Sequence, residues 1–170
     1  MPPASGPDHP RASRRYRTGR MEAFSDGVFA FAITLLVLDL TVPEGSGRDL
    51  LAAVLALWPH YLTYVVSFAT IGAVWLTHNA ITEHLDHADS TFMRLNLLPL
   101  LFVAFIPFPT RFLAQYIDSE QPERIAILLY GISAVLLFGA LVLLRWYAGK
   151  AGLLRAAPGD GELSVYQRMN

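Results

Sequence analysis

Residues Arg20–Leu40, RMEAFSDGVFAFAITLLVLDL, form an apolar stretch long enough to cross a membrane, yet polar residues stand at both of its ends. About 20 apolar residues are needed to cross a hydrocarbon core of roughly 30 Å as a helix. An Arg and a Ser-Asp pair lie near the start, an Asp lies near the end, and Thr34 interrupts the run. Because charged groups inside a bilayer are expensive, each of these positions requires a physical reason.

The composition of the whole chain is typical of a membrane protein. Of its 170 residues, 54% are hydrophobic and only 16% are charged, whereas soluble domains have about 25% charged residues. The chain has no Cys, which excludes disulfides, thiolate metal sites and Cys nucleophiles. Its net charge of −1 carries no information about nucleic-acid binding, and we expect no nucleic-acid partner. Phosphate-binding loops, nucleophile elbows and HExxH patterns are absent from the sequence, so we do not expect an enzyme.

Four apolar segments predict an all-α membrane protein, a bundle of four transmembrane helices. The segments span approximately residues 24–42, 50–77, 94–110 and 125–144. Their apolar runs are continuous rather than alternating, which disfavours membrane strands. Pro59, near the start of the second segment, suggests that a short interfacial piece precedes the span. Pro99, Pro107 and Pro109 are expected to kink or shorten the third segment.

The polar regions suggest three parts and an orientation. We expect a disordered basic arm at 1–19, a membrane domain at 20–147 and a polar cytoplasmic tail at 148–170. With the N-terminus inside, ten basic residues lie on the inner side and three on the outer side, which favours four spans with both termini cytoplasmic. We expect this protein in the plasma membrane. The inner residues are Arg11, Arg14, Arg15, Arg17, Arg20, Arg94, Arg145, Lys150, Arg155 and Arg168, and the outer ones are Arg48, Arg111 and Arg124.

One narrow stripe runs along the first predicted helix. Gly27, Phe31, Thr34, Leu38 and Thr41 are spaced by +4, +3, +4 and +3, which places them on one face. One interpretation is a tightly packed helix in which the Thr34 hydroxyl bonds to its own backbone, and spacing alone favours it. The other is a functional face that presents a hydroxyl between apolar layers near the middle of the membrane.

Asp26 also has two interpretations. It caps the helix with Ser25 if the helix begins there, which suits the positive end of the helix dipole. If the helix begins earlier, the carboxylate lies inside the span and needs a partner. His78 and Asn96 lie at the same predicted depth, so a buried network of Asp26, His78 and Asn96 would satisfy it. Structural support is favoured over gating for this network.

At the other end of the first helix, Asp39 would form an acidic ring that attracts cations if it were repeated around a symmetric pore. A solvated carboxylate at the interface is nearly as good an interpretation.

A histidine-rich stretch, HNAITEHLDHAD, follows the second apolar segment. His84 and His87 have a ligand-like spacing. A third functional hypothesis is therefore a membrane enzyme or metal transporter that uses His78, His84 and His87. Polar residues belong in this loop in any case, so we expect no metal site and no cofactor.

The opening stretch resembles the prokaryotic branch of the lysosomal potassium channel family, the transmembrane protein 175 family. The motif R-x-x-x-F-S-D is matched by Arg20, Phe24, Ser25 and Asp26. The resemblance continues through SFATIGAVWLTHN in the second segment and RLNLLPLLFVAFIPFPT in the third, and it covers about residues 16–147.

This resemblance implies a homotetramer of six-helix subunits with the first helices around a central cation pore. It further implies that Phe31, Thr34 and Leu38 form the constriction and filter region, with Phe31 where the family usually has Ile or Leu. Helix-anchoring roles near the cytoplasm are implied for Arg20, Phe24, Ser25, Asp26, Trp75, His78 and Asn96.

The expected function is therefore a potassium-permeable cation channel. The sequence has no Thr-Val-Gly-Tyr-Gly carbonyl filter, so a hydrophobic constriction and a Thr layer would take its place. The expected partners are other copies of the chain, the lipid bilayer and monovalent cations. The alternative is a non-conducting membrane scaffold or regulatory subunit that lacks the last two helices of the family.

Overall fold

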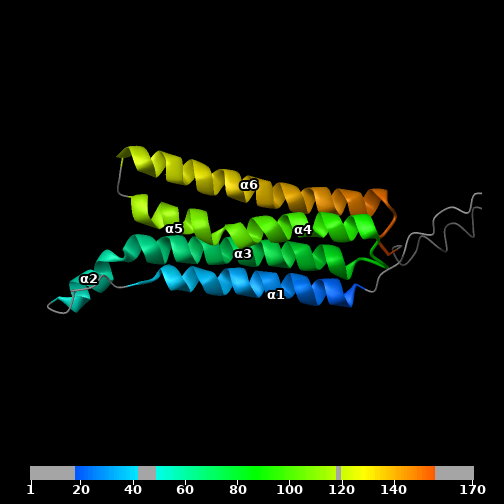
Figure 1. The fold of residues 1–170 in the computed structure, drawn as a ribbon, viewed down its shortest axis with the longest axis horizontal. Coiled ribbons are helices and arrows are strands. Elements are labelled where there is room, and N and C mark those ends of the chain that lie inside the picture. Colours follow the sequence, from blue (N-terminus) through cyan, green and yellow to red (C-terminus); the bar gives the residue numbers. More distant parts are fainter. Residues whose placement is uncertain (1–17, 42–48, 118–119, 156–170) are drawn as a thin grey trace, which may run out of the picture.

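The computed structural model describes residues 18–41, 49–117 and 120–155. Of the predicted arm at 1–19 and the predicted tail at 148–170, residues 1–17 and 156–170 lie outside these ranges. Its elements are α1 (Gly19–Leu36), the 3₁₀ turn η1 (Val37–Asp39), α2 (Leu50–Ala56), α3 (Trp58–Glu83), α4 (Ser90–Phe105), α5 (Pro107–Tyr116) and α6 (Glu120–Lys150). The long helices lie side by side in one bundle, with the start of α1 and the end of α6 at the same end and α2 at the other (Figure 1).

Four helical segments in the described residues are long and apolar enough to cross a membrane: Gly19–Asp39, Trp58–Glu83, Ser90–Tyr116 and Pro122–Lys150. This confirms the predicted all-α bundle of four spans. As predicted from Pro59, a short helix, α2, precedes the second span, and α3 begins afresh at Trp58 with Pro59 in its first turn, where a missing N–H is tolerated. The span ends at Glu83, later than the predicted end at 77.

The third span is longer than predicted and is broken. Pro99 lies inside α4, and α4 ends at Phe105, just before Pro107 opens α5. Proline cannot donate to the helix ladder, so the break occurs at the pair Pro107 and Pro109. The start of α4 is well capped, since Asp89 Oδ1 accepts a hydrogen bond from Phe92 N at 2.6 Å.

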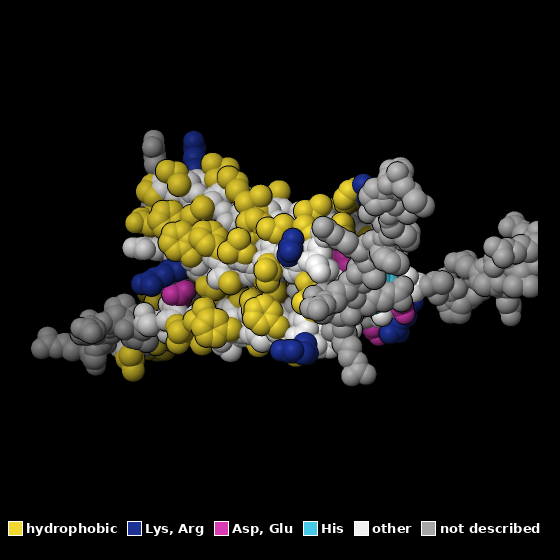
Figure 2. All heavy atoms as spheres, turned by 45° about the vertical axis from the view of Figure 1, so that its right-hand side comes forward, with side chains coloured by type: hydrophobic (Ala, Val, Ile, Leu, Met, Phe, Trp, Pro, Cys, Tyr) yellow, Lys and Arg dark blue, Asp and Glu magenta, His cyan; other side chains and the backbone are white. Residues whose placement is uncertain are grey.

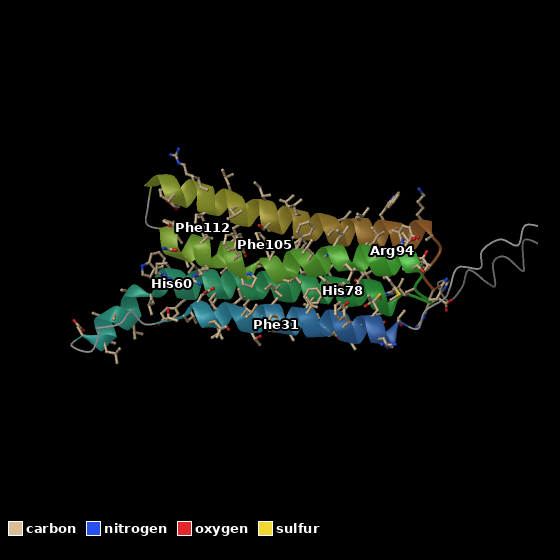
Figure 3. The ribbon with its side chains drawn as sticks, in the orientation of Figure 1. Phe31, His60, His78, Arg94, Phe105 and Phe112 are labelled. Atoms are coloured by element: carbon tan, nitrogen blue, oxygen red, sulfur yellow. The ribbon has the colours of Figure 1, made fainter. Side chains whose placement is uncertain are left out.

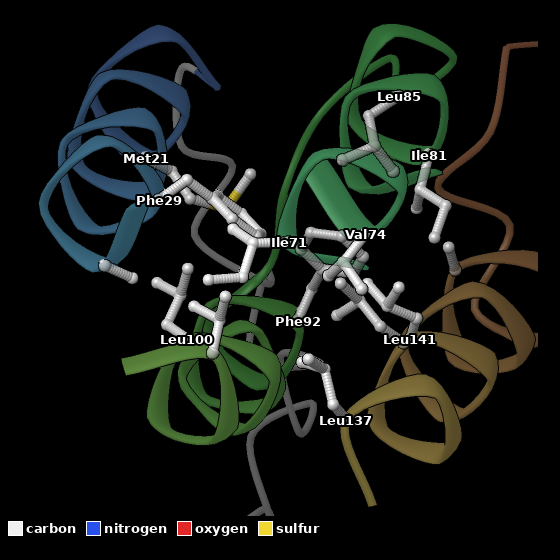
Figure 4. Packing of buried hydrophobic residues seen from close by; sticks show 14 of the residues in the cluster. Met21, Phe29, Ile71, Val74, Ile81, Leu85, Phe92, Leu100, Leu137 and Leu141 are labelled. Carbon is white, nitrogen blue, oxygen red and sulfur yellow. The ribbon is translucent and has the colours of Figure 1, made fainter. Parts of the chain in front are cut away.

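The core lies between α1, α3, α4 and α6. Met21 and Phe29 on α1 face residues of α3 and α4, and Leu137 on α6 closes the far side of the cluster (Figure 4). Helices α1 and α6 both pack on the central α3, α4 and α5. The remaining surface is unusually apolar for a soluble protein, with hydrophobic side chains over much of the visible face (Figure 2). Such exposure is expected for helices that contact lipid or other subunits.

The chain turns back at the end of α6. Gly152 has a φ of 64°, a left-handed conformation that glycine adopts at low cost. After this turn, Asp86 N donates to Leu153 O and Arg155 N donates to His84 O, both at 2.9 Å. Leu153 is thus buried against the α3–α4 connection, so the packed chain continues beyond the end of α6.

Candidate functional site

The first helix has two contrasting faces. Its buried residues are Met21, Ser25, Phe29, Ala32 and Leu36. The predicted stripe lies about 200° away around the helix, two residues on from the buried positions. Phe31 is 64% exposed and Leu38 is 66% exposed, and Thr34 between them is exposed as well. None of the other helices that the structure describes covers this face, and Phe31 points away from the bundle in Figure 3.

The Thr34 hydroxyl bonds to its own backbone, as one of the two interpretations proposed. Its Oγ1 donates to the carbonyl oxygen of Phe31 at 2.9 Å. That bond uses the only hydroxyl proton, so the lone pairs of the oxygen remain available on the exposed face. Back-bonding and an outward-facing acceptor are therefore compatible at this position.

A buried polar chain links α1, α3 and α4 near the start of α1. His78 Nε2 lies 2.6 Å from Asn96 Oδ1, and Asn96 Nδ2 donates to Ser25 Oγ at 3.0 Å. All three residues are at most 2% exposed. Since the amide nitrogen faces Ser25, the amide oxygen must accept a proton from His78 Nε2, which assigns the tautomer of a neutral imidazole. The ring of Phe29 lies 5.4 Å from that of His78 and closes the site on the apolar side.

Asp26 does not belong to this chain, in contrast to the predicted network of Asp26, His78 and Asn96. Helix α1 already begins at Gly19, so Ser25 and Asp26 point about 100° apart. Ser25 faces Asn96, whereas Asp26 is exposed and accepts a hydrogen bond from Trp75 Nε1 at 2.9 Å. Five of the motif and anchoring residues are thus bonded within the subunit: Ser25, His78 and Asn96 form the buried chain, and Asp26 pairs with Trp75.

Arg20 and Phe24, the first two motif residues, are exposed in the single chain, and Phe24 is 57% exposed. Neither ion pair found among the described residues includes Arg20. Their predicted anchoring role therefore finds no support in contacts within one subunit.

Asp39 has a basic neighbour that the sequence reading did not foresee. Arg111 Nε, from α5, lies 3.7 Å from Asp39 Oδ1. The two residues also line a hollow of about 360 Å³ together with Leu38, Thr41, Leu57, His60 and Gln115. The positive charge offsets the field of the carboxylate that was predicted to attract cations.

A cluster of hydroxyls was also missed. Ser67 Oγ lies 2.7 Å from Thr110 Oγ1 and 3.2 Å from Tyr130 OH, to which Thr70 is also bonded at 3.2 Å. These bonds join α3, α5 and α6. The only sequence signal was the pair Ser67 and Thr70, which stand one helical turn apart in an apolar run.

The histidine-rich stretch is dispersed in the structure. His84 Nδ1 bonds to the carbonyl oxygen of Ala80 in its own helix, and His87 pairs with Asp86 at 3.2 Å. Within the described ranges, no three His, Asp or Glu side chains come together as metal ligands would.

The chain is similar to known channel proteins. The family described as the endosomal/lysosomal potassium channel TMEM175 matches residues 20–107. A potassium channel of Streptomyces collinus is 43% identical over 138 residues, which cover 81% of this chain and 67% of the relative. A potassium channel of Chamaesiphon minutus is 44% identical over 124 residues, 71% of this chain and 61% of the relative.

A crystal structure of a lysosomal potassium-selective channel TMEM175 homologue from Chamaesiphon minutus superposes with a TM-score of 0.73 at 40% identity. It covers 77% of this chain and 71% of that chain. The chain thus spans about two thirds of the length of the relatives it matches, which are named as channels and not as enzymes. On these matches and on its four apolar helices, the chain belongs to the TMEM175 family of multi-pass helical membrane proteins.

Proposed function

We propose that the chain forms a potassium-permeable cation channel in which α1 helices of several copies surround a central pore. The observation that carries the proposal is the uncovered face of α1, where Phe31, Thr34 and Leu38 are exposed opposite a fully packed face. An apolar helix face needs lipid or protein against it. Four copies related by symmetry would cover it with identical faces and place these residues around one axis.

The chemistry of the stripe suits a pore without a carbonyl filter. Rings of Phe31 and Leu38 would form hydrophobic constrictions, which hinder ion passage by excluding water. Between them, the Thr34 oxygens would face the axis with free lone pairs, since their protons are bonded to the Phe31 carbonyl. Such oxygens can replace part of the hydration shell of a weakly hydrated monovalent cation.

Ion flux into proteoliposomes under a potassium gradient tests this proposal. Leu38→Ala and Phe31→Ala would widen the constrictions, and we expect faster flux. Leu128→Ala is a matched control, because Leu128 is 62% exposed on α6, far from the proposed pore face. If the purified chain carries no flux, or if its flux is the same in the Phe31 and Leu38 variants as in the control, the pore assignment is wrong.

Oligomeric state distinguishes the channel from a non-conducting scaffold or regulatory subunit. Crosslinking in native membranes should yield a homotetramer if the pore proposal holds. A monomer, or a complex only with other proteins, would favour the scaffold.

We further propose that the protein lies in the plasma membrane with the α1 start and the α6 end on the cytoplasmic side. The excess of basic residues at that end of the bundle supports this orientation.

A further inference from the structure

Arg111 is an exposed cation in an apolar span. It lies in α5, within the candidate span Ser90–Tyr116, and its side chain is 74% exposed. A guanidinium stays charged at all physiological pH values and carries five N–H donors. Its contact with Asp39 is made through Nε at 3.7 Å, which is longer than a hydrogen bond. Among the described residues, donors of this guanidinium therefore remain free for another acceptor.

The surroundings of Arg111 are aromatic on one side. Phe108, Arg111, Phe112 and Gln115 line a hollow of about 300 Å³ on α5. Their spacing of three, four and seven residues from Phe108 places them on one face of the helix. Phe108 is 57% exposed, and Gln115 is exposed. Two polar donor groups and an apolar floor thus lie side by side near the end of a membrane span, where headgroups meet acyl chains.

We propose that this hollow binds an anionic phospholipid from the leaflet at the α2 end of the bundle. The lipid phosphate would accept hydrogen bonds from the Arg111 guanidinium and the Gln115 amide, and its acyl chain would lie over Phe108 and Phe112. The fork of an arginine matches phosphate oxygens in geometry and charge. The net negative charge of the lipid complements a cation whose carboxylate neighbour is not within hydrogen-bond distance.

The site also adjoins the hollow at the end of α1, because Arg111 and Gln115 line both. A phosphate bound to Arg111 would therefore compete with Asp39 for the same guanidinium. Lipid composition would then change the net charge next to the end of the α1 stripe. This coupling depends on the proposed function, whereas lipid binding itself does not.

Native mass spectrometry of the purified chain in detergent tests the binding. The protein is titrated with dioleoyl phosphatidylglycerol and, separately, with dioleoyl phosphatidylcholine. We expect tighter binding of phosphatidylglycerol, and a loss of about tenfold or more in its affinity for Arg111→Gln, since charge-assisted bonds are removed. Arg111→Lys should bind with intermediate affinity. Arg94→Gln is the matched control: it is also an exposed arginine, at the opposite end of the same span, and should leave binding unchanged.

Phe108→Ala provides a second test that leaves the charge in place. We expect it to weaken phosphatidylglycerol binding by about threefold or more, because apolar contact with the acyl chain is lost. Since Phe108 is 57% exposed, its replacement should not disturb the fold. Circular dichroism and gel filtration establish that each variant is folded. A thermal-shift titration with inorganic phosphate tests whether the free ion stabilises the protein as the lipid does.

Three results would overturn the proposal. One is equal phosphatidylglycerol affinity in the wild type and in Arg111→Gln. Another is equal affinity for the anionic and the zwitterionic lipid. The third is stabilisation by inorganic phosphate that equals stabilisation by the lipid, which would assign the hollow to the free ion.

Discussion

Replacing Asn96 by Leu should destabilise the bundle, because this amide is the middle of the buried chain that joins α1, α3 and α4. The substitution removes the 2.6 Å bond to His78 and the 3.0 Å bond to Ser25 in a site that is almost fully excluded from solvent. The loss of the hydrogen bond costs the two partners different amounts of free energy. The Ser25 hydroxyl can turn to the backbone carbonyl one helical turn earlier, as serines in membrane helices commonly do.

His78 has no such alternative, and its Nε2 proton is left buried without an acceptor. A buried orphan donor costs about 1–3 kcal/mol. Single interhelical hydrogen bonds in membranes contribute less, about 0.6 kcal/mol on average. We therefore expect the free energy of unfolding of Asn96→Leu to fall by about 1–3 kcal/mol, with most of the loss due to His78.

Unfolding in mixed micelles of detergent and dodecyl sulfate, followed by circular dichroism, measures this loss. Asn79→Leu is the control, since Asn79 is the same residue type, exposed on α3 next to His78. If the orphan donor is the cause, adding His78→Phe to Asn96→Leu should recover most of the stability, because both polar partners are then gone. A loss below about 0.5 kcal/mol in Asn96→Leu, within the usual range for a surface change, would refute the reasoning, as would simple additivity of the two changes.

Three further outcomes are expected. Trp75→Phe removes the indole donor to the exposed α1 carboxylate and should lower the unfolding free energy by at most about 1 kcal/mol in the same assay; a larger loss would indicate a hidden packing role. Tyr147→Phe removes the 2.7 Å bond to Asp89 and should cost about 1 kcal/mol, while the Asp89 cap of α4 is retained; an unchanged midpoint would mean that the bond has no net value. The chain has no Cys, so single-cysteine variants report topology: a membrane-impermeant maleimide should label Leu51→Cys in intact cells and label Lys150→Cys only after lysis; the reverse pattern would invert the proposed orientation.

The sequence predicted the number and type of spans well because that information is local. A continuous apolar run of sufficient length has few stable alternatives in a bilayer. It also predicted that prolines disturb the third span. The position of the break was less accessible, because Pro99 is accommodated within α4 and the helix is interrupted only at Pro107. Whether a membrane helix tolerates a proline depends on which neighbours satisfy the freed backbone groups, and this is tertiary information.

The sequence predicted which polar residues form the site better than it predicted which of them are hydrogen-bonded to one another. Asp26, His78 and Asn96 were predicted to form one network at one depth, yet the α1 group that bonds to Asn96 is Ser25, next to the predicted carboxylate. A shift of one residue rotates a side chain by about 100°, so depth along the axis does not determine which group meets which. The Asp39–Arg111 pair could not be predicted for a similar reason. Its prediction requires knowing how α5 is rotated and placed after the break at Pro107.

The two faces of α1 make separable contributions, and this separation explains why polar residues occur at such places in a membrane helix. Ser25 lies on the packed face and fixes the helix to α3 and α4 through Asn96. Thr34 lies on the exposed face, and its hydroxyl bonds to the backbone of its own helix at the Phe31 carbonyl. A change at the anchor should therefore lower stability and shift all positions of the uncovered face together, whereas a change at Thr34 should leave the unfolding free energy nearly unaltered. We expect Thr34→Val to alter potassium flux without altering the free energy of unfolding, and Asn96→Leu to alter both. These results would show that α1 acts as a rigid element: its packed face fixes its position, and its exposed face carries the residues that contact the ion.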